Sequence, residues 1–362
     1  MTGSNQNRRT FMKASAAGAT MLALPSLVTA KRAASRPDEV IVGQGDYQYT
    51  VNHAWCQLPD KYQWQTTHNV AVDSENNLYV IHEGNRQLKD HPAIFVFDGE
   101  GKFVRAFGCQ FQGGGHGIEI RKEGDGEYLY VAAYQQVKAF AKMTLQGDTV
   151  WFKKAPMESG IYADGEDVST EPTWSRSGFL PTNFAFLDDG GFLLADGYGT
   201  FHIHRFDSHG NWVNSFGGAG DGKGTFNTAH GLWVDKRDGV EARIVVTDRA
   251  HDTLQVFDME GNYQKTLDGF GLPANIDTQG ALMLVPELKA RISLLDTNDQ
   301  VVATLGAAVE RLDEVQNLRG QPDKWLDGQF VHPHDACFDR DGNIFVAEWV
   351  STGRITKLTK KS

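Results

Sequence analysis

Cysteine is scarce in this sequence, and its three copies stand in a chain of 362 residues at Cys56, Cys109 and Cys337. Three cysteines form at most one disulfide, and no Cys-x-x-Cys pair occurs, so neither a disulfide framework nor a thiolate zinc site is predicted. Lys and Arg are outnumbered by Asp and Glu, 35 to 46, and no basic cluster lies away from the termini. That balance argues against a nucleic-acid partner.

Long apolar runs are also lacking after the N-terminal region, so we expect no membrane span there. The N-terminal region itself resembles a twin-arginine export signal. Arg8 and Arg9 precede an apolar stretch from Ala14 to Val28, and the small residue Ala30 suits a cleavage site. The stretch of about 15 apolar residues is short for a membrane anchor. We therefore expect residues 1–30 to be an export signal and the mature chain to be periplasmic or extracellular.

One short motif recurs six times along the rest of the chain, and each copy alternates apolar and polar residues with the period of a strand. Most copies run into a turn rich in Gly or Asn and then into a second apolar strand. The equivalent positions, here called the shared position, are His68, His116, Thr182, His230, Ala274 and His334. Six units of about four strands each predict an all-β, six-bladed β-propeller of the NHL-repeat type over residues 31–362, with a β-sandwich as the alternative.

Two of the spacings between copies are longer than the others, which predicts inserted segments. One covers roughly Gln146 to Gly178, and the other covers Ala307 to Gly328, with a short helix near Val309 to Val315. Inserts in a propeller lie on its faces, where they can cover a central site. The segment from Tyr47 to Val51 is expected to supply an outer strand that closes the ring against the last repeat.

Three of the histidines at the shared position fall on alternate repeats. The first strand of each blade lines the central channel, so His116, His230 and His334 are predicted to meet at its axis. Three neutral imidazoles with an open fourth position are typical of a catalytic zinc ion. A structural role, in which each imidazole only bonds a neighbouring blade, is the alternative. His68 breaks the alternation, and we expect it to support the site or to be structural.

The chain from about His68 onward resembles the peptidyl-α-hydroxyglycine α-amidating lyases. The resemblance is closest over Pro181 to Tyr198, Gly224 to Leu232, Thr247 to Arg249 and Pro333 to Asp335. It implies a Zn²⁺ ion on three histidines, which match His116, His230 and His334. It also implies a structural Ca²⁺ on two backbone carbonyls and an aspartate, which match Val70, Ile118 and Asp335.

The same resemblance assigns a tyrosine base to Tyr198 and a neighbouring arginine to Arg249. An unperturbed tyrosine has a pKa near 10, so it acts as a base only if nearby positive charge stabilises the phenolate. Packing of Tyr198 on its blade, and a blade-to-blade tie by Arg249, are the structural alternatives.

This sequence departs from the family at one charged position. A second substrate-binding arginine of the family falls on Glu83, where a carboxylate would repel a substrate carboxylate. The family's disulfide cysteines are also missing. We therefore expect a metal-dependent, lyase-like propeller acting on a different small-molecule or peptide-like substrate. Two other functions stay open: a non-catalytic NHL propeller that binds a protein or glycan, and a metal-dependent hydrolase or lactonase.

Overall fold

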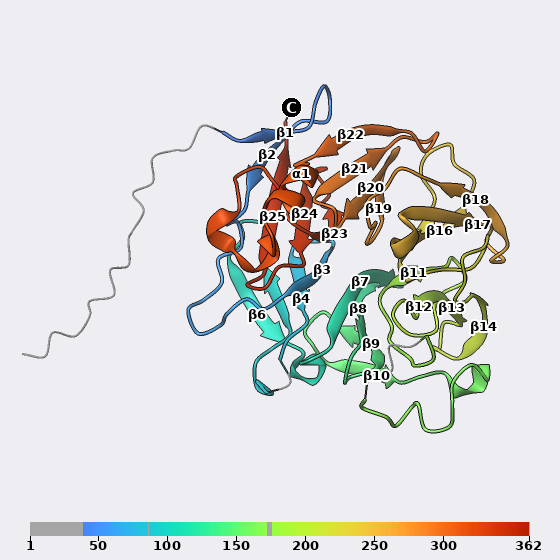
Figure 1. The fold of residues 1–362 in the computed structure, drawn as a ribbon. Coiled ribbons are helices and arrows are strands. Elements are labelled where there is room, and N and C mark those ends of the chain that lie inside the picture. The colour runs from blue at the N-terminus through green and yellow to red at the C-terminus, as the bar shows by residue number, and fades with distance from the viewer. Residues whose placement is uncertain (1–38, 86, 172–175, 362) are drawn as a thin grey trace, which may run out of the picture. The chain divides into compact units, whose positions relative to one another are not determined.

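The computed structural model describes residues 39–85, 87–171 and 176–361, and the predicted export signal lies outside them. Residues Glu39–Ser362 form one compact unit. Its strands make six antiparallel sheets arranged around a common centre (Figure 1). The prediction of an all-β, six-bladed β-propeller is confirmed.

Each of the first five blades is built from four consecutive strands. Blade one holds β3 (Thr67–Val72), β4 (Leu78–His82), β5 (Ile94–Phe97) and β6 (Phe103–Phe107), and blade two holds β7 (Gly115–Glu123), β8 (Gly126–Ala133), β9 (Ala139–Thr144) and β10 (Thr149–Lys153). Blade three holds β11 (Phe184–Phe186), β12 (Phe192–Ala195), β13 (His202–Phe206) and β14 (Trp212–Gly217), and blade four holds β15 (Ala229–Asp235), β16 (Arg243–Asp248), β17 (Thr253–Phe257) and β18 (Tyr263–Leu267). Blade five holds β19 (Asp277–Gln279), β20 (Leu282–Glu287), β21 (Arg291–Leu295) and β22 (Val301–Leu305).

The sixth blade joins the two ends of the described chain. Its inner three strands are β23 (Pro333–Phe338), β24 (Ile344–Glu348) and β25 (Arg354–Lys360), and its outer two are β2 (Tyr49–Asn52) and β1 (Ile41–Val42). Tyr49 pairs with Lys360 across the closure, and its ring is fully buried in the core between blades five and six. The predicted closing strand is therefore present.

Turns of one kind connect strands within the blades. In each turn an aspartate side chain accepts hydrogen bonds from the backbone N–H groups two and four residues later, and the six such residues are Asp73, Asp98, Asp207, Asp258, Asp296 and Asp339. Aspartate favours this local geometry because its short carboxylate reaches its own backbone. The core lies between blades, where apolar side chains of facing sheets form clusters such as Ala185, Leu193, Leu232, Val246 and Phe257.

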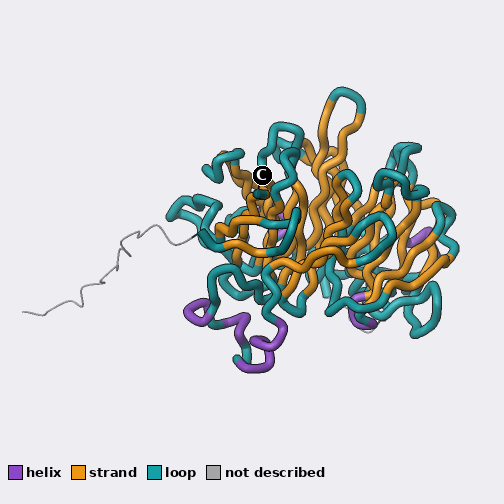
Figure 2. Tube along the Cα trace, turned by 90° about the horizontal axis from the view of Figure 1, so that it is seen from above, coloured by secondary structure: helices purple, strands orange, loops and turns teal. Residues whose placement is uncertain are grey.

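The inserted segments differ from the prediction at one boundary. Thr149–Lys153 is the outer strand β10 of blade two, so the first insert begins after Lys153 rather than at Gln146. The second insert carries α1 (Val309–Glu314), as predicted, and two short 3₁₀ turns, Leu318–Gly320 and Pro322–Lys324. Figure 2 shows helical turns (purple) that project from the body of strands at the lower left of the view, whereas other purple turns lie among the strands. Among the described residues no helix is long and apolar enough to cross a membrane.

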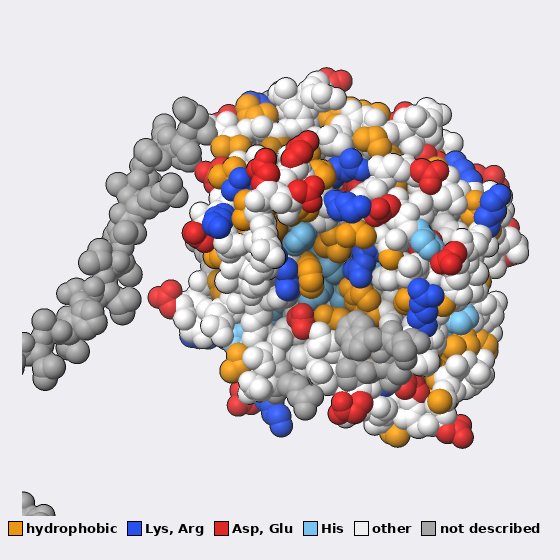
Figure 3. Space-filling view, in the orientation of Figure 1, with side chains coloured by type: hydrophobic (Ala, Val, Ile, Leu, Met, Phe, Trp, Pro, Cys, Tyr) orange, Lys and Arg blue, Asp and Glu red, His pale blue; other side chains and the backbone are white. Residues whose placement is uncertain are grey.

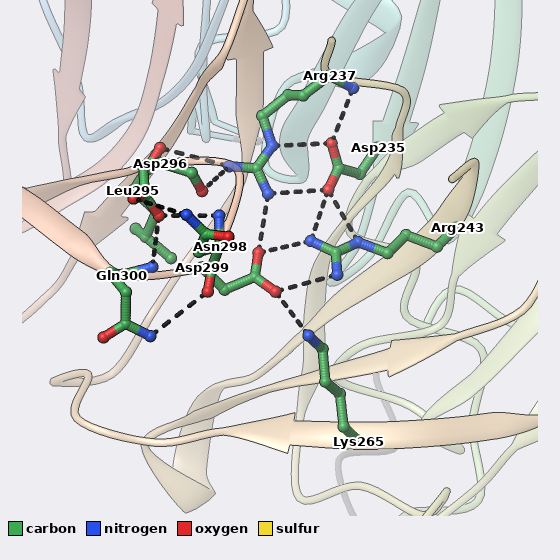
Figure 4. A network of polar contacts seen from close by, with 9 residues as sticks. All are labelled: Asp235, Arg237, Arg243, Lys265, Leu295, Asp296, Asn298, Asp299 and Gln300. Carbon is green, nitrogen blue, oxygen red and sulfur yellow. Dashed lines mark hydrogen bonds and ion pairs between the residues drawn. The ribbon is translucent and has the colours of Figure 1, made fainter. Parts of the chain in front are cut away.

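A buried charge network ties blade four to blade five (Figure 4). Asp299 accepts hydrogen bonds from Arg237 at 2.8 Å and from Lys265 at 2.8 Å, and Arg243 pairs with both Asp299 and Asp235. Hydrogen bonds from these cations lower the pKa of Asp299 to about 2, against the opposing effect of burial, which is the largest single influence. The network sits away from the shared position and serves packing between blades.

Candidate metal centre

Four histidines occupy the shared position, and each stands at a break in the register of its strand. The pairing of the inner strand with its neighbour shifts around His68 in β3, His116 in β7, His230 in β15 and His334 in β23. Such bulges redirect a side chain out of the ordinary alternation, and here the redirected side chain is the imidazole. No such shift occurs in the inner strands of blades three and five, where Thr182 and Ala274 precede the strand.

Three of the imidazoles make the same contact with the next blade. Nδ1 of His116 lies 2.9 Å from the carbonyl oxygen of Thr182, and Nδ1 of His230 lies 2.6 Å from that of Ala274. Nδ1 of His334 lies 2.8 Å from the carbonyl oxygen of His68. A carbonyl only accepts, so each Nδ1 carries the hydrogen and each Nε2 presents a lone pair. This is the arrangement that metal-binding histidines adopt.

Two glycines make this contact possible. A Cβ on Gly117, directly after His116, would lie 2.1 Å from the Thr182 carbonyl oxygen. A Cβ on Gly231, directly after His230, would lie 2.5 Å from that of Ala274. Both distances are far below van der Waals contact, so the His-Gly pairs of blades two and four are required by the approach of the next blade.

The imidazole rings of His116, His230 and His334 lie close together. His116 Nε2 and His230 Nε2 are 3.2 Å apart, and the ring of His334 lies 4.9 Å from that of His116 and 4.7 Å from that of His230, between centroids. His334 Nε2 is buried and has no hydrogen-bond partner among the described residues. The structure therefore brings the three sequence-predicted ligands close together.

His68 joins the same cluster but differs from the other three. Its Nδ1 faces the carbonyl oxygen of Thr66, just before its own strand, at 3.3 Å, and its Nε2 lies 4.0 Å from a carboxylate oxygen of Glu83. Even so, ligand atoms of His68, His116 and His334 lie within 4.8 Å of one another. The distances between ligand atoms thus allow His68 as the third ligand. The hydrogen bond from Nδ1 to the next blade, which His68 lacks, favours His230 instead.

Burial keeps the whole cluster neutral. It lowers the pKa of His116 to about 3 and moves those of His68, His230 and His334 well below their usual range. The positive charge of Arg249 contributes to the lowering at His116, His230 and His334. Neutral imidazoles are the form that binds metal ions.

A second ring of residues lies above the histidines, and we call it the mouth ring. In every blade a residue that follows the second strand donates its backbone N–H to a carbonyl near the start of the blade. The accepting carbonyl lies two residues before the shared position, and the distances are 2.8–3.2 Å. The six residues are Glu83, Tyr134, Tyr198, Arg249, Leu288 and Trp349. Tyr198 and Arg249 are therefore equivalent positions in blades three and four, which explains why the sequence places both at the site.

Tyr198 is the member of the mouth ring that touches the histidines through its hydroxyl. Its Oη lies 2.9 Å from His230 Nε2 and 3.4 Å from His116 Nε2, and Arg249 Nη1 donates to it over 2.9 Å. The guanidinium also lies over the phenol ring, 4.9 Å from its centroid. Burial raises the pKa of Tyr198, and Arg249 opposes that rise.

Sequence reasoning missed Tyr134, which the mouth ring places beside Tyr198. Its ring lies 5.0 Å from that of His116 and 5.3 Å from that of Tyr198. Gln135 Nε2 donates to Tyr134 Oη at 2.9 Å and to Glu83 Oε1 at 2.6 Å, which fixes both side chains. The signal in the sequence was its place directly after the second strand. Two histidines away from the shared position, His82 and His204, are also fully buried.

The residues matched to a calcium site lie further along the channel. One carboxylate oxygen of Asp335 accepts from Val70 N at 2.8 Å and the other accepts from Asn275 Nδ2 at 2.6 Å. Ile118 N is bonded to the Asn69 side chain at 3.2 Å. Asp335 also lines a cavity of about 150 Å³, together with Glu119 and Asp277. Burial raises the pKa of Asp335 to about 7 and that of Asp277 to about 6, so these carboxyls lack compensating positive charge.

Comparisons with known proteins support the fold of this chain and assign it to no family. No protein-family model matches the chain, and no curated protein matches it. Virginiamycin B lyase from Staphylococcus aureus, solved with quinupristin, superposes with a TM-score of 0.53 at 13% identity over 86% of this chain and 99% of that one.

Two further solved structures give the same result. A structure with a provisional assignment as a gluconolactonase gives a TM-score of 0.52 at 11% identity, over 86% of this chain and 92% of that one. A Bacteroides thetaiotaomicron protein of unknown function gives 0.53 at 14% identity, over 89% of this chain and 76% of that one. Likeness at these identities defines the class as a six-bladed β-propeller. The resemblance to amidating lyases and the NHL assignment stay hypotheses.

Proposed function

We propose that this chain is an exported, metal-dependent enzyme with lyase-like chemistry, and that His116, His230 and His334 hold one zinc ion. The observation that supports it most is the 3.2 Å approach of His116 Nε2 to His230 Nε2. Both Nδ1 atoms already donate to carbonyls, so neither Nε2 of the neutral rings has a hydrogen for the other. Ligands at about 2.0–2.1 Å from a tetrahedral zinc ion would lie about 3.3 Å apart, close to this separation.

The residues around the cluster fit the breakage of an N-acyl hemiaminal. Zinc, when bound, would polarise the oxygen of the substrate hydroxyl. In the proposed reaction Tyr198 accepts the hydroxyl proton, the oxygen lone pair forms the carbonyl double bond, and the C–N bond breaks. The electron pair of that bond stays on nitrogen, which takes the proton back from Tyr198. The products are an amide and a carbonyl compound. Arg249 stabilises the Tyr198 phenolate that accepts the first proton and that forms again when the proton passes to nitrogen.

A hydrolase or lactonase is the second candidate. It is supported by the likeness of the fold to a structure provisionally assigned as a gluconolactonase. The two activities differ in product, because hydrolysis adds water across the broken bond whereas the lyase reaction yields an amide and a carbonyl compound. Product analysis by mass spectrometry with water labelled in ¹⁸O therefore separates them: only a hydrolase places the label in an acid.

Two further features belong to the same proposal. A structural Ca²⁺ would be held by Asp335 with the carbonyls of Val70 and Ile118, where it would offset the charge of the buried carboxylates around the cavity. Export would follow the twin-arginine route, with cleavage near Ala30. Calcium content and the melting temperature with and without a chelator test the first, and Asp335→Asn is expected to abolish the difference.

Metal analysis of the purified mature protein tests the proposal as a whole. We expect about one zinc ion per chain. Protein that binds no zinc after loading with the metal would contradict the enzyme and leave a propeller that binds a protein or glycan through its face.

A further inference from the structure

Arg319 lies beside the mouth ring, on the second insert. Its guanidinium stacks over the ring of Trp349 at 3.5 Å, its Nε donates to the Trp349 carbonyl at 3.0 Å, and its Nη2 donates to Thr66 Oγ1 at 3.3 Å. The carbonyl of Arg319 accepts from Ser351 N at 3.2 Å. Four contacts with blades six and one thus fix an arginine whose own segment is only a short 3₁₀ turn.

A small apolar core holds that segment in place. Leu318, next to Arg319, is buried together with Val331 and Val350, and Leu312, Val315 and Trp325 pack against them. The insert is therefore anchored to blade six rather than free to swing. A side chain held this firmly loses little further entropy when it binds a ligand, which favours recognition.

In the described part of the chain, the charge of Arg319 is balanced by no close ion pair. Burial lowers the pKa of Arg319, and the more distant Glu83 carboxylate opposes that larger effect. No carboxylate of the described residues lies within 4.0 Å of it, and Nη1 has no hydrogen-bond partner there. Arg249, across the mouth ring, likewise makes no ion pair in this part of the chain and contacts Tyr198 instead. Two unpaired guanidinium groups are unexpected at one opening of a chain with net charge −11. Figure 3 shows Lys or Arg side chains on both sides of the histidines seen near the centre of this face.

The arginine lies within electrostatic reach of the cluster. Its positive charge contributes to the lowered pKa of His68. Thr66 links the two residues, because its hydroxyl accepts from Arg319 and its carbonyl oxygen faces Nδ1 of His68. Glu83 is also near, but its carboxylate is engaged by Gln135 at 2.6 Å. The free edge of Arg319 therefore borders the opening on the blade-six side, opposite the Tyr198–Arg249 pair.

We propose that Arg319 is a substrate-binding residue that receives a carboxylate of the substrate, while the reacting hydroxyl lies at Tyr198. The proposal deepens the function given above and rests on it for the position of the reacting group. A planar guanidinium suits a carboxylate because parallel N–H groups match its two oxygens. The carboxylate would lie over Trp349 in blade six rather than at Glu83 in blade one, so the substrate would span the opening.

Binding of two matched probes tests the assignment. Glycolate and glycolamide are nearly equal in size, and only glycolate is charged, so their affinities for the metal-loaded protein are compared by calorimetry. We expect Arg319→Ala to weaken glycolate roughly 10- to 100-fold, the value of a hydrogen bond to a charged group, and to leave glycolamide unchanged. Arg319→Lys keeps the charge but removes the parallel N–H groups, and it should give an intermediate loss of glycolate affinity. Arg340→Ala, an exposed arginine in the turn after β23, is the control and should bind both probes as the wild type does.

The outcomes separate this inference from the proposed function. An Arg319→Ala protein that binds glycolate as the wild type does, or that loses both probes equally, would overturn the role of Arg319. Metal content is measured on the same samples. Absent zinc with glycolate binding that still depends on Arg319 would refute the metal centre and support the anion site.

Discussion

The hydroxyl of Tyr198 lies between the imidazole of His230 and the guanidinium of Arg249. Its oxygen is 2.9 Å from His230 Nε2 and accepts a hydrogen bond from Arg249 Nη1 at 2.9 Å. The two residues are equivalent members of the mouth ring in adjacent blades. Their contact is therefore set by the geometry of the propeller and not by a flexible loop. This pairing gives the proposed chemistry its most direct tests.

Removal of the Tyr198 hydroxyl should abolish most activity without loss of metal. Tyr198→Phe keeps the ring and removes only the ionisable oxygen, and loss of a general base typically costs about 10²–10⁴ in rate. Tyr134→Phe is the matched control in the neighbouring blade, and it should cost less because its hydroxyl is bonded to Gln135. Steady-state rates and zinc content of both variants check this, and full activity in Tyr198→Phe would exclude it as the base.

Removal of the Arg249 charge should shift the pH dependence of the rate. The guanidinium lowers the pKa of Tyr198 against the effect of burial, so Arg249→Ala raises that pKa. The deprotonated form of Tyr198 then appears only at higher pH, and the rising limb of the pH–rate profile shifts to higher pH. Arg249→Lys keeps a charge and should move the limb less. A profile that stays in place in Arg249→Ala would show that the rate does not report a base beside this arginine.

The network around Asp299 should contribute stability that acid removes. The pKa of Asp299 is about 2 in the folded chain, against an ordinary value near 3.9 in an unfolded one. Its stabilisation is therefore present above about pH 4 and is lost as the pH falls toward 2. Asp299→Asn should cost on the order of 3 kcal/mol at neutral pH, because it leaves Asp235 as the only carboxylate that balances the charges of Arg237 and Arg243 in the described network.

Urea unfolding of Asp299→Asn at several pH values measures that contribution. The control is Asp188→Asn, which breaks the exposed pair with Lys236 and should cost less than about 1 kcal/mol. Equal losses in the two variants would contradict a special role for the network.

Export should depend on the arginine pair near the N-terminus. Replacement of Arg8 and Arg9 together by lysine keeps the charge and removes the twin-arginine address. The precursor should then stay in the cytoplasm, which fractionation and immunoblotting would show. Normal export of this double variant would refute the predicted route.

The sequence predicted the ring of blades because its repeats keep the strand period, and it placed His116, His230 and His334 on alternate blades for the same reason. It did not predict the bulges at the four histidines, since a register shift depends on pairing with the next strand. The alternation of blades also sets His68 apart in the sequence, although it joins the same cluster in the structure.

The mouth ring was only partly visible from the sequence. Tyr198 and Arg249 entered through a family resemblance, whereas Tyr134 and Arg319 carried no motif. Tyr134 becomes recognisable once the end of the second strand is known in each blade, because the same backbone hydrogen bond follows that strand in all six blades. Arg319 reaches the opening through the packing of an insert, and no local pattern encodes that contact.

The zinc content of two single variants tests the central claim most directly. His230→Ala and His68→Ala remove the same group from neighbouring positions of one cluster, but only His230 donates through Nδ1 to the next blade as His116 and His334 do. Mass spectrometry of purified, zinc-loaded protein should find about one ion per chain in the wild type and in His68→Ala, and little in His230→Ala. Retention of zinc in His230→Ala, or its loss in His68→Ala alone, would contradict the proposed ligand set.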